Sequence, residues 1–517
     1  MPCQREDVQP PMADVVSIDP RTGTPVETVA ATTGDAEVDA LCRAAAQAAP
    51  VLAAMSRAER AALLRAVAQA LEAERAAIVT VADRETALGE TRLNGELTRT
   101  CFQFEQFAAA LEEGSYLEAT IDHAADTPMG PRPDLRRMLV PLGPVAVFGA
   151  SNFPLAFSVP GGDTASALAA GCPVVVKAHS SHPATSKLCY DIMVRALREA
   201  GAPDGVLGIV YGQQAGAALV RHPVIRAVGF TGSLRGGRFL FDLASSRPDP
   251  IPFYGELGSI NPLVVTPAAA AARAQEIAEG IVGSFTLGAG QFCTKPGLVF
   301  LPDDAAGKQV GEAIAAAVAE RQPVVLLNAA IQRDYLARWE QTADDPAVRR
   351  RAEGAPADSA GWSVPVRLLE TSAEELTVAA TEECFGPVTV LVTYRGLDDL
   401  RAALAKVPDS LTATLIAEDD EEFADEVAPV LRAMAGRLVY NGYPTGVAVS
   451  WAMTHGGVWP ATTNALHTSV GMTAMRRFLK PVTWQNAPQR LLPDELRDHP
   501  EHPVPRRVNG RLVLPEH

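Results

Sequence analysis

The chain carries Val145-Ala-Val-Phe-Gly149, then Pro173-Val-Val-Val-Lys177, then Ala227-Val-Gly-Phe-Thr231, three short apolar runs bounded by Gly, Pro or polar residues. A further strand is predicted at 206–211, and helical spacing follows the strands at 164–170, 186–200 and 215–221. This alternation predicts a parallel sheet covered by helices on both faces. Polar residues at the strand ends lie where open α/β sheets bind their ligands.

The flanking segments extend this pattern. Residues 35–113 are rich in Ala, Leu, Arg and Glu at helical spacing, which predicts two or three helices with a break at Pro50. Residues 124–134 predict a linker, followed by a strand at 135–140. Residues 1–12 predict a loose tail.

A second α/β region is predicted from about Asn261 to Leu438. Within it, residues 349–363 are highly charged and predict a surface loop. The Pro-rich end after Pro488 predicts an extended arm. No internal repeat interrupts this organisation.

Composition narrows the function classes. The 517 residues predict about two to four domains. Hydrophobic residues make up 47% and charged residues 21%, which excludes a largely disordered chain. The net charge of −16 argues against a nucleic-acid partner. The seven cysteines are scattered and odd in number, which favours a reducing compartment.

The expected location is the cytoplasm, without contact to a membrane. The N-terminus has no apolar signal core, and no run of about 18 apolar residues lacks charges or helix breakers.

Three residues have the chemistry of acyl transfer. Cys293 follows a Gly-rich stretch that leaves its sulfur uncovered, and a thiolate there could attack a carbonyl. Glu256 stands between small and apolar residues, where burial would suit a general base. Asn152 follows a strand and could direct its amide at an oxyanion. Each alone is more commonly structural: a buried cysteine, a solvated glutamate, a turn asparagine.

Two turns add weaker signals. Gly232 and Ser233 close a strand in Gly229-Phe-Thr-Gly-Ser233, where backbone N–H groups could meet a pyrophosphate, although the pattern alone favours a plain βα turn. Glu383 and Phe385 lie in a second such turn.

Taken together and in this order, the segments resemble the NAD(P)-dependent aldehyde dehydrogenases. The similarity runs from about Asp19 to about Pro493. The matching words are SNFP at 151–154, VVVK at 174–177, GFTGS at 229–233, ELG at 256–258, GQFC at 290–293 and EECFGPV at 382–388. The resemblance implies an α/β fold with a Rossmann-like cofactor domain, an α/β catalytic domain and a small β oligomerisation flap.

The resemblance also assigns roles. It implies that Cys293 is the nucleophile, Glu256 the general base and Asn152 the oxyanion donor. It places the cofactor at Lys177, Ser180, Gly232, Ser233, Glu383 and Phe385. NAD-preferring members often carry Glu where Ser180 stands, so the sequence favours NADP and leaves NAD open.

The C-terminal third of the chain differs from the sequence that is usual in this family. Asn441-Gly-Tyr-Pro-Thr-Gly-Val447 and Met453-Thr-His-Gly-Gly457 replace the usual loop. With 131–137 and 156–166, these stretches resemble the subgroup that oxidises α-ketoglutarate semialdehyde (2,5-dioxopentanoate) to 2-oxoglutarate. The expected pocket residues are Phe153, Phe157, Phe292, Trp451 and Thr454.

Alternatives remain open. The chain could be an NADP-dependent fatty aldehyde dehydrogenase, a CoA-acylating relative, or a catalytically silent binding protein on the same fold. No metal is expected, because the pairs His179/His182 and His499/His502 lack the spacing of known metal motifs.

The resemblance divides the chain into four parts. Residues 12–122 and 142–257 would form the cofactor domain, and 258–445 the catalytic domain. Residues 446–477 would form the substrate-pocket and return segment, and 123–141 with 478–512 the flap. Because a two-stranded ribbon is marginal alone, a homodimer or homotetramer is expected.

Overall fold

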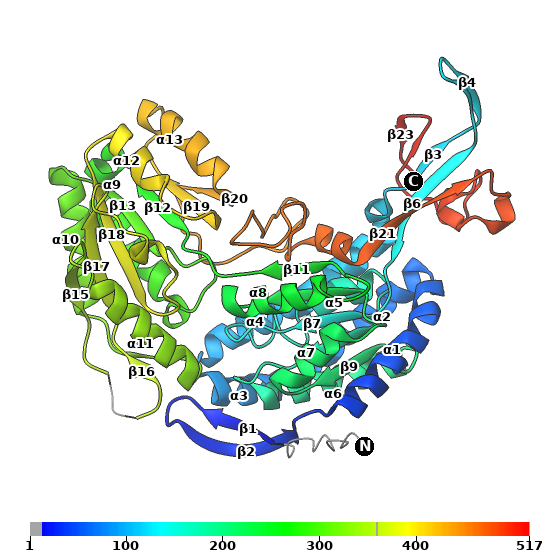
Figure 1. Ribbon diagram of the computed structural model, residues 1–517, viewed down its shortest axis with the longest axis horizontal. Coiled ribbons are helices and arrows are strands. Elements are labelled where there is room, and N and C mark those ends of the chain that lie inside the picture. Colours follow the sequence, from blue (N-terminus) through cyan, green and yellow to red (C-terminus); the bar gives the residue numbers. More distant parts are fainter. Residues whose placement is uncertain (1–12, 358–359, 516–517) are drawn as a thin grey trace, which may run out of the picture.

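The computed structural model describes residues 13–357 and 360–515, so the predicted N-terminal tail lies outside the described residues. Two sheets form the cores of the two halves of the structure, and a third sheet projects from one end (Figure 1). The chain starts with a hairpin of β1 (Asp14–Asp19) and β2 (Thr24–Ala31).

The first sheet has five parallel strands in the order β11-β10-β7-β8-β9, which confirms the predicted α/β alternation. Along β7, Val145 and Val147 contribute to one apolar cluster, whereas Ala146 and Phe148 contribute to another. Both faces of the sheet are therefore buried under helices, as the continuous apolar runs require. The elements are β7 (Val145–Phe148), α5 (Gly162–Ala169), β8 (Val174–Lys177), α6 (Pro183–Glu199), β9 (Leu207–Val210), α7 (Gln213–Arg221), β10 (Ala227–Thr231), α8 (Leu234–Ser245) and β11 (Phe253–Glu256).

Four helices precede this sheet, where the sequence predicted two or three. They are α1 (Asp35–Ala54), α2 (Arg57–Ala73), α3 (Arg75–Thr86) and α4 (Glu90–Glu113). The predicted break at Pro50 is wrong, because α1 continues through it. Pro50 is exposed near the end of α1, where water can satisfy the carbonyl that loses its partner.

The second sheet has seven strands in the order β15-β17-β18-β13-β12-β19-β20. All are parallel except β15, at one edge. The predicted loop at 349–363 is therefore partly wrong. Arg349 and Arg351 form ion pairs with Glu370 on the neighbouring strand, and Arg351 also pairs with Glu312 on a helix. These pairs let a charged segment form the edge of the sheet. The elements are β12 (Pro262–Val265), α9 (Pro267–Thr286), β13 (Leu298–Pro302), α10 (Ala305–Ala319), α11 (Ala329–Ala343), β15 (Arg349–Glu353), β17 (Arg367–Ser372), β18 (Val388–Tyr394), α12 (Leu397–Leu404), β19 (Ser410–Ile416), α13 (Glu422–Ala433) and β20 (Ala435–Tyr440); β14 (Val324–Val325) pairs with β16 (Ser363–Val364) outside it.

The third sheet joins distant parts of the chain in the order β21-β6-β3-β22-β23. Its strands are β3 (Thr120–Asp122), β6 (Leu135–Pro141), β21 (Leu479–Gln485), β22 (Arg506–Val508) and β23 (Arg511–Val513). The predicted linker at 124–134 instead forms a hairpin of β4 (Ala125–Thr127) and β5 (Gly130–Arg132), which extends beyond the rest of the molecule (Figure 1).

Within residues 13–357 and 360–515, no helix is long and apolar enough to cross a membrane. The six cysteines described are all free thiols.

Candidate active site

Three side chains from distant parts of the chain meet between the two large sheets. Glu256 is the last residue of β11, Cys293 follows the 3-10 turn at Leu287–Gly290, and His455 belongs to the irregular segment after β20. His455 Nε2 lies 3.5 Å from Cys293 Sγ and 2.7 Å from Glu256 Oε1. The hydroxyl of Ser469 donates to the other carboxylate oxygen of Glu256. The structure thus brings together the predicted nucleophile and base around a histidine.

The surroundings set the protonation of these groups. Burial alone raises the pKa of Glu256, but His455 and the hydrogen bonds from His455, Ser469 and Cys293 outweigh it, so the pKa lies below its usual value. Burial and the nearby carboxylate of Glu256 raise the pKa of the Cys293 thiol well above its usual value. The resting pair is therefore a neutral thiol beside an ionised carboxylate, and thiolate formation needs a proton acceptor and a hydrogen-bond donor.

The backbone around Cys293 is fixed from both sides. Gly290 has φ +68°, and a Cβ there would lie 2.3 Å from the carbonyl oxygen of Gly386, so only glycine fits this turn. The side-chain amide of Asn261 donates to the carbonyls of Cys293 (2.8 Å) and Lys295 (2.9 Å). These contacts hold the nucleophile in place relative to β12.

Asn152 lies beside this loop, as predicted for an oxyanion donor. Its Nδ2 donates to the carbonyl oxygen of Gln291 at 2.8 Å, and its own carbonyl accepts from Arg92 at 2.6 Å. An amide nitrogen carries two N–H groups, so one remains for a ligand next to Cys293.

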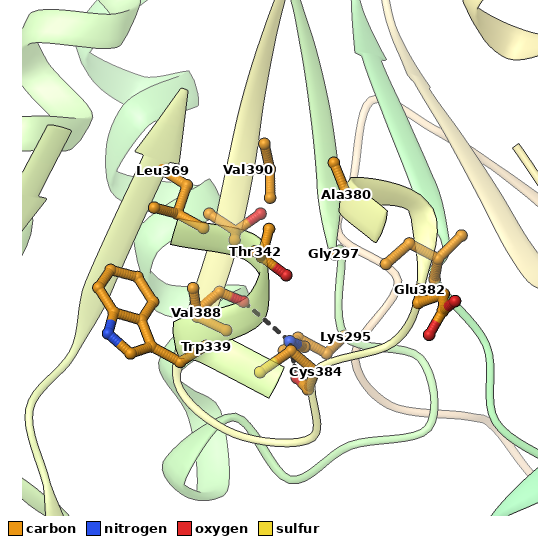
Figure 2. A pocket seen from close by; sticks show the side chains of 12 residues that line it. Lys295, Gly297, Trp339, Thr342, Leu369, Ala380, Glu382, Cys384, Val388 and Val390 are labelled. Carbon is orange, nitrogen blue, oxygen red and sulfur yellow. Dashed lines mark hydrogen bonds between the residues drawn. The ribbon is translucent and has the colours of Figure 1, made fainter. Parts of the chain in front are cut away.

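A buried lysine links the nucleophile loop to the turn that holds Glu383. Figure 2 shows Lys295 pointing towards Val388 beside Cys384, in a small cavity closed by Trp339. Its Nζ donates to the carbonyls of Cys384 (2.7 Å) and Val388 (2.8 Å). A shift of either loop would leave a buried ammonium unpaired, so Lys295 couples the positions of Cys293 and Glu383.

The predicted cofactor residues lie at the carboxyl ends of the first sheet and across from it. Lys177 ends β8; burial lowers its pKa to about 8, and no carboxylate of the described residues opposes this shift. Ser180 is exposed three residues later. Gly232 and Ser233 are exposed at the start of α8, where Ser233 Oγ accepts from the N–H of Gly236 at 3.2 Å.

These residues fit a dinucleotide. The first turn of α8 offers N–H groups to a phosphate, and Lys177 offers an unpaired cation. On the other side, Glu383 points back to the N–H of Ser259, and burial raises its pKa to about 7. Phe385 is partly exposed two residues further on.

Three of the five predicted pocket residues form one cluster. The Phe153 ring lies 5.2 Å from that of Phe157 and 5.1 Å from that of Phe292, both edge-on. Trp451 is 45% exposed and Thr454 is also exposed, so neither belongs to this cluster.

Sequence reasoning missed His455, Ser469 and three arginines, Arg92, Arg99 and Arg437. One indication of His455 was available in the sequence, because this residue lies in the stretch that differs from the usual family sequence. The sulfur, imidazole and carboxylate of Cys293, His455 and Glu256 lie within 4.8 Å of one another, a spacing compatible with metal ligation. The expectation that no metal takes part therefore stays a prediction.

Comparison with known proteins identifies the family of this chain. The model of the aldehyde dehydrogenase family matches residues 8–479. Alpha-ketoglutaric semialdehyde dehydrogenase 2 of Azospirillum brasilense is 45% identical over 96% of this chain and 95% of its own length. An alpha-ketoglutaric semialdehyde dehydrogenase of Acinetobacter baylyi is 42% identical over 92% of this chain and 91% of its own.

Solved structures agree on the fold. An E. coli NADP-dependent enzyme superposes with a TM-score of 0.78 at 23% identity, covering 92% of this chain and 94% of that one. At this level of identity the likeness concerns the fold alone.

Proposed function

Because the chain belongs to the aldehyde dehydrogenase family, we propose that it oxidises 2,5-dioxopentanoate to 2-oxoglutarate through an acyl group carried by Cys293. The protein is an NAD(P)-dependent oxidoreductase of aldehydes. The substrate is proposed from the 45% identity, over nearly the full length of both chains, to the alpha-ketoglutaric semialdehyde dehydrogenase 2 of Azospirillum brasilense.

The first step is formation of the Cys293 thiolate. Glu256 is ionised and accepts the thiol proton, since the two side chains are hydrogen-bonded. His455 Nε2 lies 3.5 Å from the sulfur, and an N–H at this position stabilises the thiolate.

The thiolate then attacks the aldehyde carbon. The free N–H of Asn152 and the backbone N–H of Cys293 stabilise the oxyanion. The oxidised nicotinamide cofactor, when bound, would accept the hydride from the aldehyde carbon. After Glu256 has passed the thiol proton to solvent, its carboxylate takes a proton from the water that hydrolyses the acyl group, and the sulfur of Cys293 leaves as a thiolate. A small cavity lies beside the Glu256 carboxylate and is also lined by His455, Thr462 and Ser469.

The family uses NAD or NADP, and we propose that this chain prefers NADP. No carboxylate within residues 13–357 and 360–515 acts on the Lys177 cation, and Ser180 stands where a glutamate would repel a 2′-phosphate. The two residues support binding of that phosphate.

A competing substrate class deserves a direct test. The ring cluster of Phe153, Phe157 and Phe292 favours an apolar aldehyde, as in fatty aldehyde dehydrogenases. The proposal is tested by following reduced-cofactor absorbance with 2,5-dioxopentanoate, succinic semialdehyde and hexanal, each with NADP or NAD and with or without CoA. We expect the highest kcat/KM with 2,5-dioxopentanoate and NADP, independent of CoA. Preference for hexanal would establish the alternative, and a CoA requirement would indicate acyl transfer.

We also propose that the β21-β6-β3-β22-β23 sheet mediates a homodimer or homotetramer. The domain boundaries given under the sequence analysis remain part of this proposal. On β23 and just after it, Leu512, Val513 and Leu514 are 66%, 43% and 65% exposed. Such apolar exposure on a narrow projecting sheet supports a protein contact. A monomer at micromolar concentration in analytical ultracentrifugation would overturn this part.

A further inference from the structure

Two arginines stack on the aromatic cluster of Phe153, Phe157 and Phe292. Arg92 stacks over the rings of Phe153 and Phe292 at 4.9 and 5.0 Å. Arg99 stacks over Phe157 at 5.2 Å. Both belong to α4 and are seven residues apart, so they lie on the same face of that helix. The apolar wall of the pocket therefore carries positive charge.

Arg99 has free hydrogen-bonding capacity. Its Nη1 donates to the carbonyl of Val447, but its Nε and Nη2 are buried and have no hydrogen-bond partner within the described part of the chain. Nε–H and Nη2–H lie on one edge of the guanidinium and match the two oxygens of a carboxylate. Arg99 as a whole is partly exposed, whereas these two nitrogens are buried.

The other half of the protein contributes Arg437, from β20. Its Nη1 donates to Gly446 at 2.8 Å and its Nη2 to Pro444, whereas its Nε is buried and unpartnered within residues 13–357 and 360–515. Arg99 and Arg437 thus both donate to carbonyls of one loop, 444–447. This loop belongs to the stretch 441–447, which differs from the usual sequence of the family.

Both guanidinium groups lie close enough to Cys293 to feel its charge. Burial lowers the pKa of Arg99, while Glu96, Cys293 and Glu256 oppose that shift. Burial likewise lowers the pKa of Arg437, and Cys293 opposes it. The ring of Phe157, under Arg99, lies 6.4 Å from that of His455, which contacts the sulfur.

Glu96 does not satisfy these cations. Its Oε1 accepts from the N–H groups of Leu155 (2.8 Å) and Ala156 (3.0 Å), and its Oε2 has no partner among the residues described. It lies between Arg92 and Arg99 on α4 and offsets one of their two charges. The site keeps a net positive charge, and buried donors without acceptors are costly unless a ligand satisfies them.

We propose that Arg99, with Arg437 on the same loop, binds the carboxylate of the substrate and selects short aldehydes that carry one. This proposal rests on the proposed function, because it concerns how the same site distinguishes 2,5-dioxopentanoate from neutral aldehydes. The five-carbon substrate spans about 5 Å over its four carbon–carbon bonds, so its carboxylate stays near Cys293 when the aldehyde reacts.

The test compares 2,5-dioxopentanoate with pentanal, a neutral aldehyde of equal length. In Arg99→Met, which keeps the stem but removes the charge, the ratio of the two kcat/KM values is expected to fall about 10- to 100-fold, equivalent to about 1.4–2.8 kcal/mol. Competitive inhibition by glutarate should weaken in parallel. The matched control is Arg43→Met, which removes a 70% exposed arginine from α1.

Arg99→Lys keeps the charge but loses the two-pronged edge, and it serves if Arg99→Met does not fold. We expect a selective loss of a few-fold to tenfold for 2,5-dioxopentanoate. An unchanged ratio in a folded Arg99 variant would overturn the proposal. Equal losses with both aldehydes would also overturn it. If the wild type instead prefers pentanal, the proposed function fails, which is a different result from an Arg99 variant with wild-type selectivity.

Discussion

Replacing His455 with leucine tests the least expected part of the site. The change keeps a buried apolar volume but removes the Nε2–H that lies 3.5 Å from Cys293 Sγ and 2.7 Å from Glu256 Oε1. A hydrogen bond to a charged group contributes about 1.5–3 kcal/mol. At about 1.4 kcal/mol per tenfold change, kcat/KM should fall roughly 10- to 150-fold.

The pH profile separates this role from a structural one. Burial and Glu256 already raise the pKa of Cys293, and losing the donor disfavours the thiolate further. The acid limb of kcat/KM, and the rate of Cys293 alkylation by iodoacetamide, should therefore shift to higher pH. His467→Leu is the matched control, since His467 lines the same small cavity without contacting Cys293. A His455→Leu enzyme with the wild-type rate and profile, or equal effects in both variants, would refute the reasoning.

The other predictions concern residues that sequence and structure both place at the site. Glu256→Gln should give a burst of reduced cofactor of at most one per active site and then slow turnover, because the amide cannot accept a proton; steady wild-type turnover in stopped-flow absorbance would contradict this. Asn152→Ala should lower kcat about 10²- to 10³-fold at nearly constant KM, the usual effect of losing one oxyanion donor; a rise in KM alone would assign it to substrate binding. Lys177→Met should raise KM for NADP more than for NAD. In the wild type, burial lowers the pKa of Lys177 to about 8, so its charge is present below and lost above that pH; KM for NADP should rise above pH 8, and a flat profile would exclude Lys177 from phosphate binding.

The first sheet could be predicted because its strands are buried on both faces and therefore have continuous apolar sequences. The same reasoning fails where tertiary contacts override a local signal. Pro50 lies within α1 since its exposed position tolerates a lost hydrogen bond, and β15 forms from a charged segment whose arginines find partners on β17 and α10.

The site divides in the same way. Cys293, Glu256 and Asn152 stand in distinctive local sequences, so their chemistry could be proposed without a structure. His455 lies 162 residues from Cys293 in a segment without regular structure, and only the path of that segment between the two sheets brings it to the sulfur. Arg99 and Arg437 belong to a helix and a strand with no catalytic motif, and their significance follows from unsatisfied donors that sequence alone does not reveal.

The central claim is that an acyl group is carried on Cys293. The most direct measurement is peptide mass spectrometry of Glu256→Gln, quenched in acid after mixing with 2,5-dioxopentanoate and NADP. The account predicts an acyl adduct on the peptide that contains Cys293, removed by hydroxylamine and absent when the cofactor or Cys293 itself is missing. A burst of reduced cofactor with an unmodified Cys293, or an adduct on another cysteine, would contradict it.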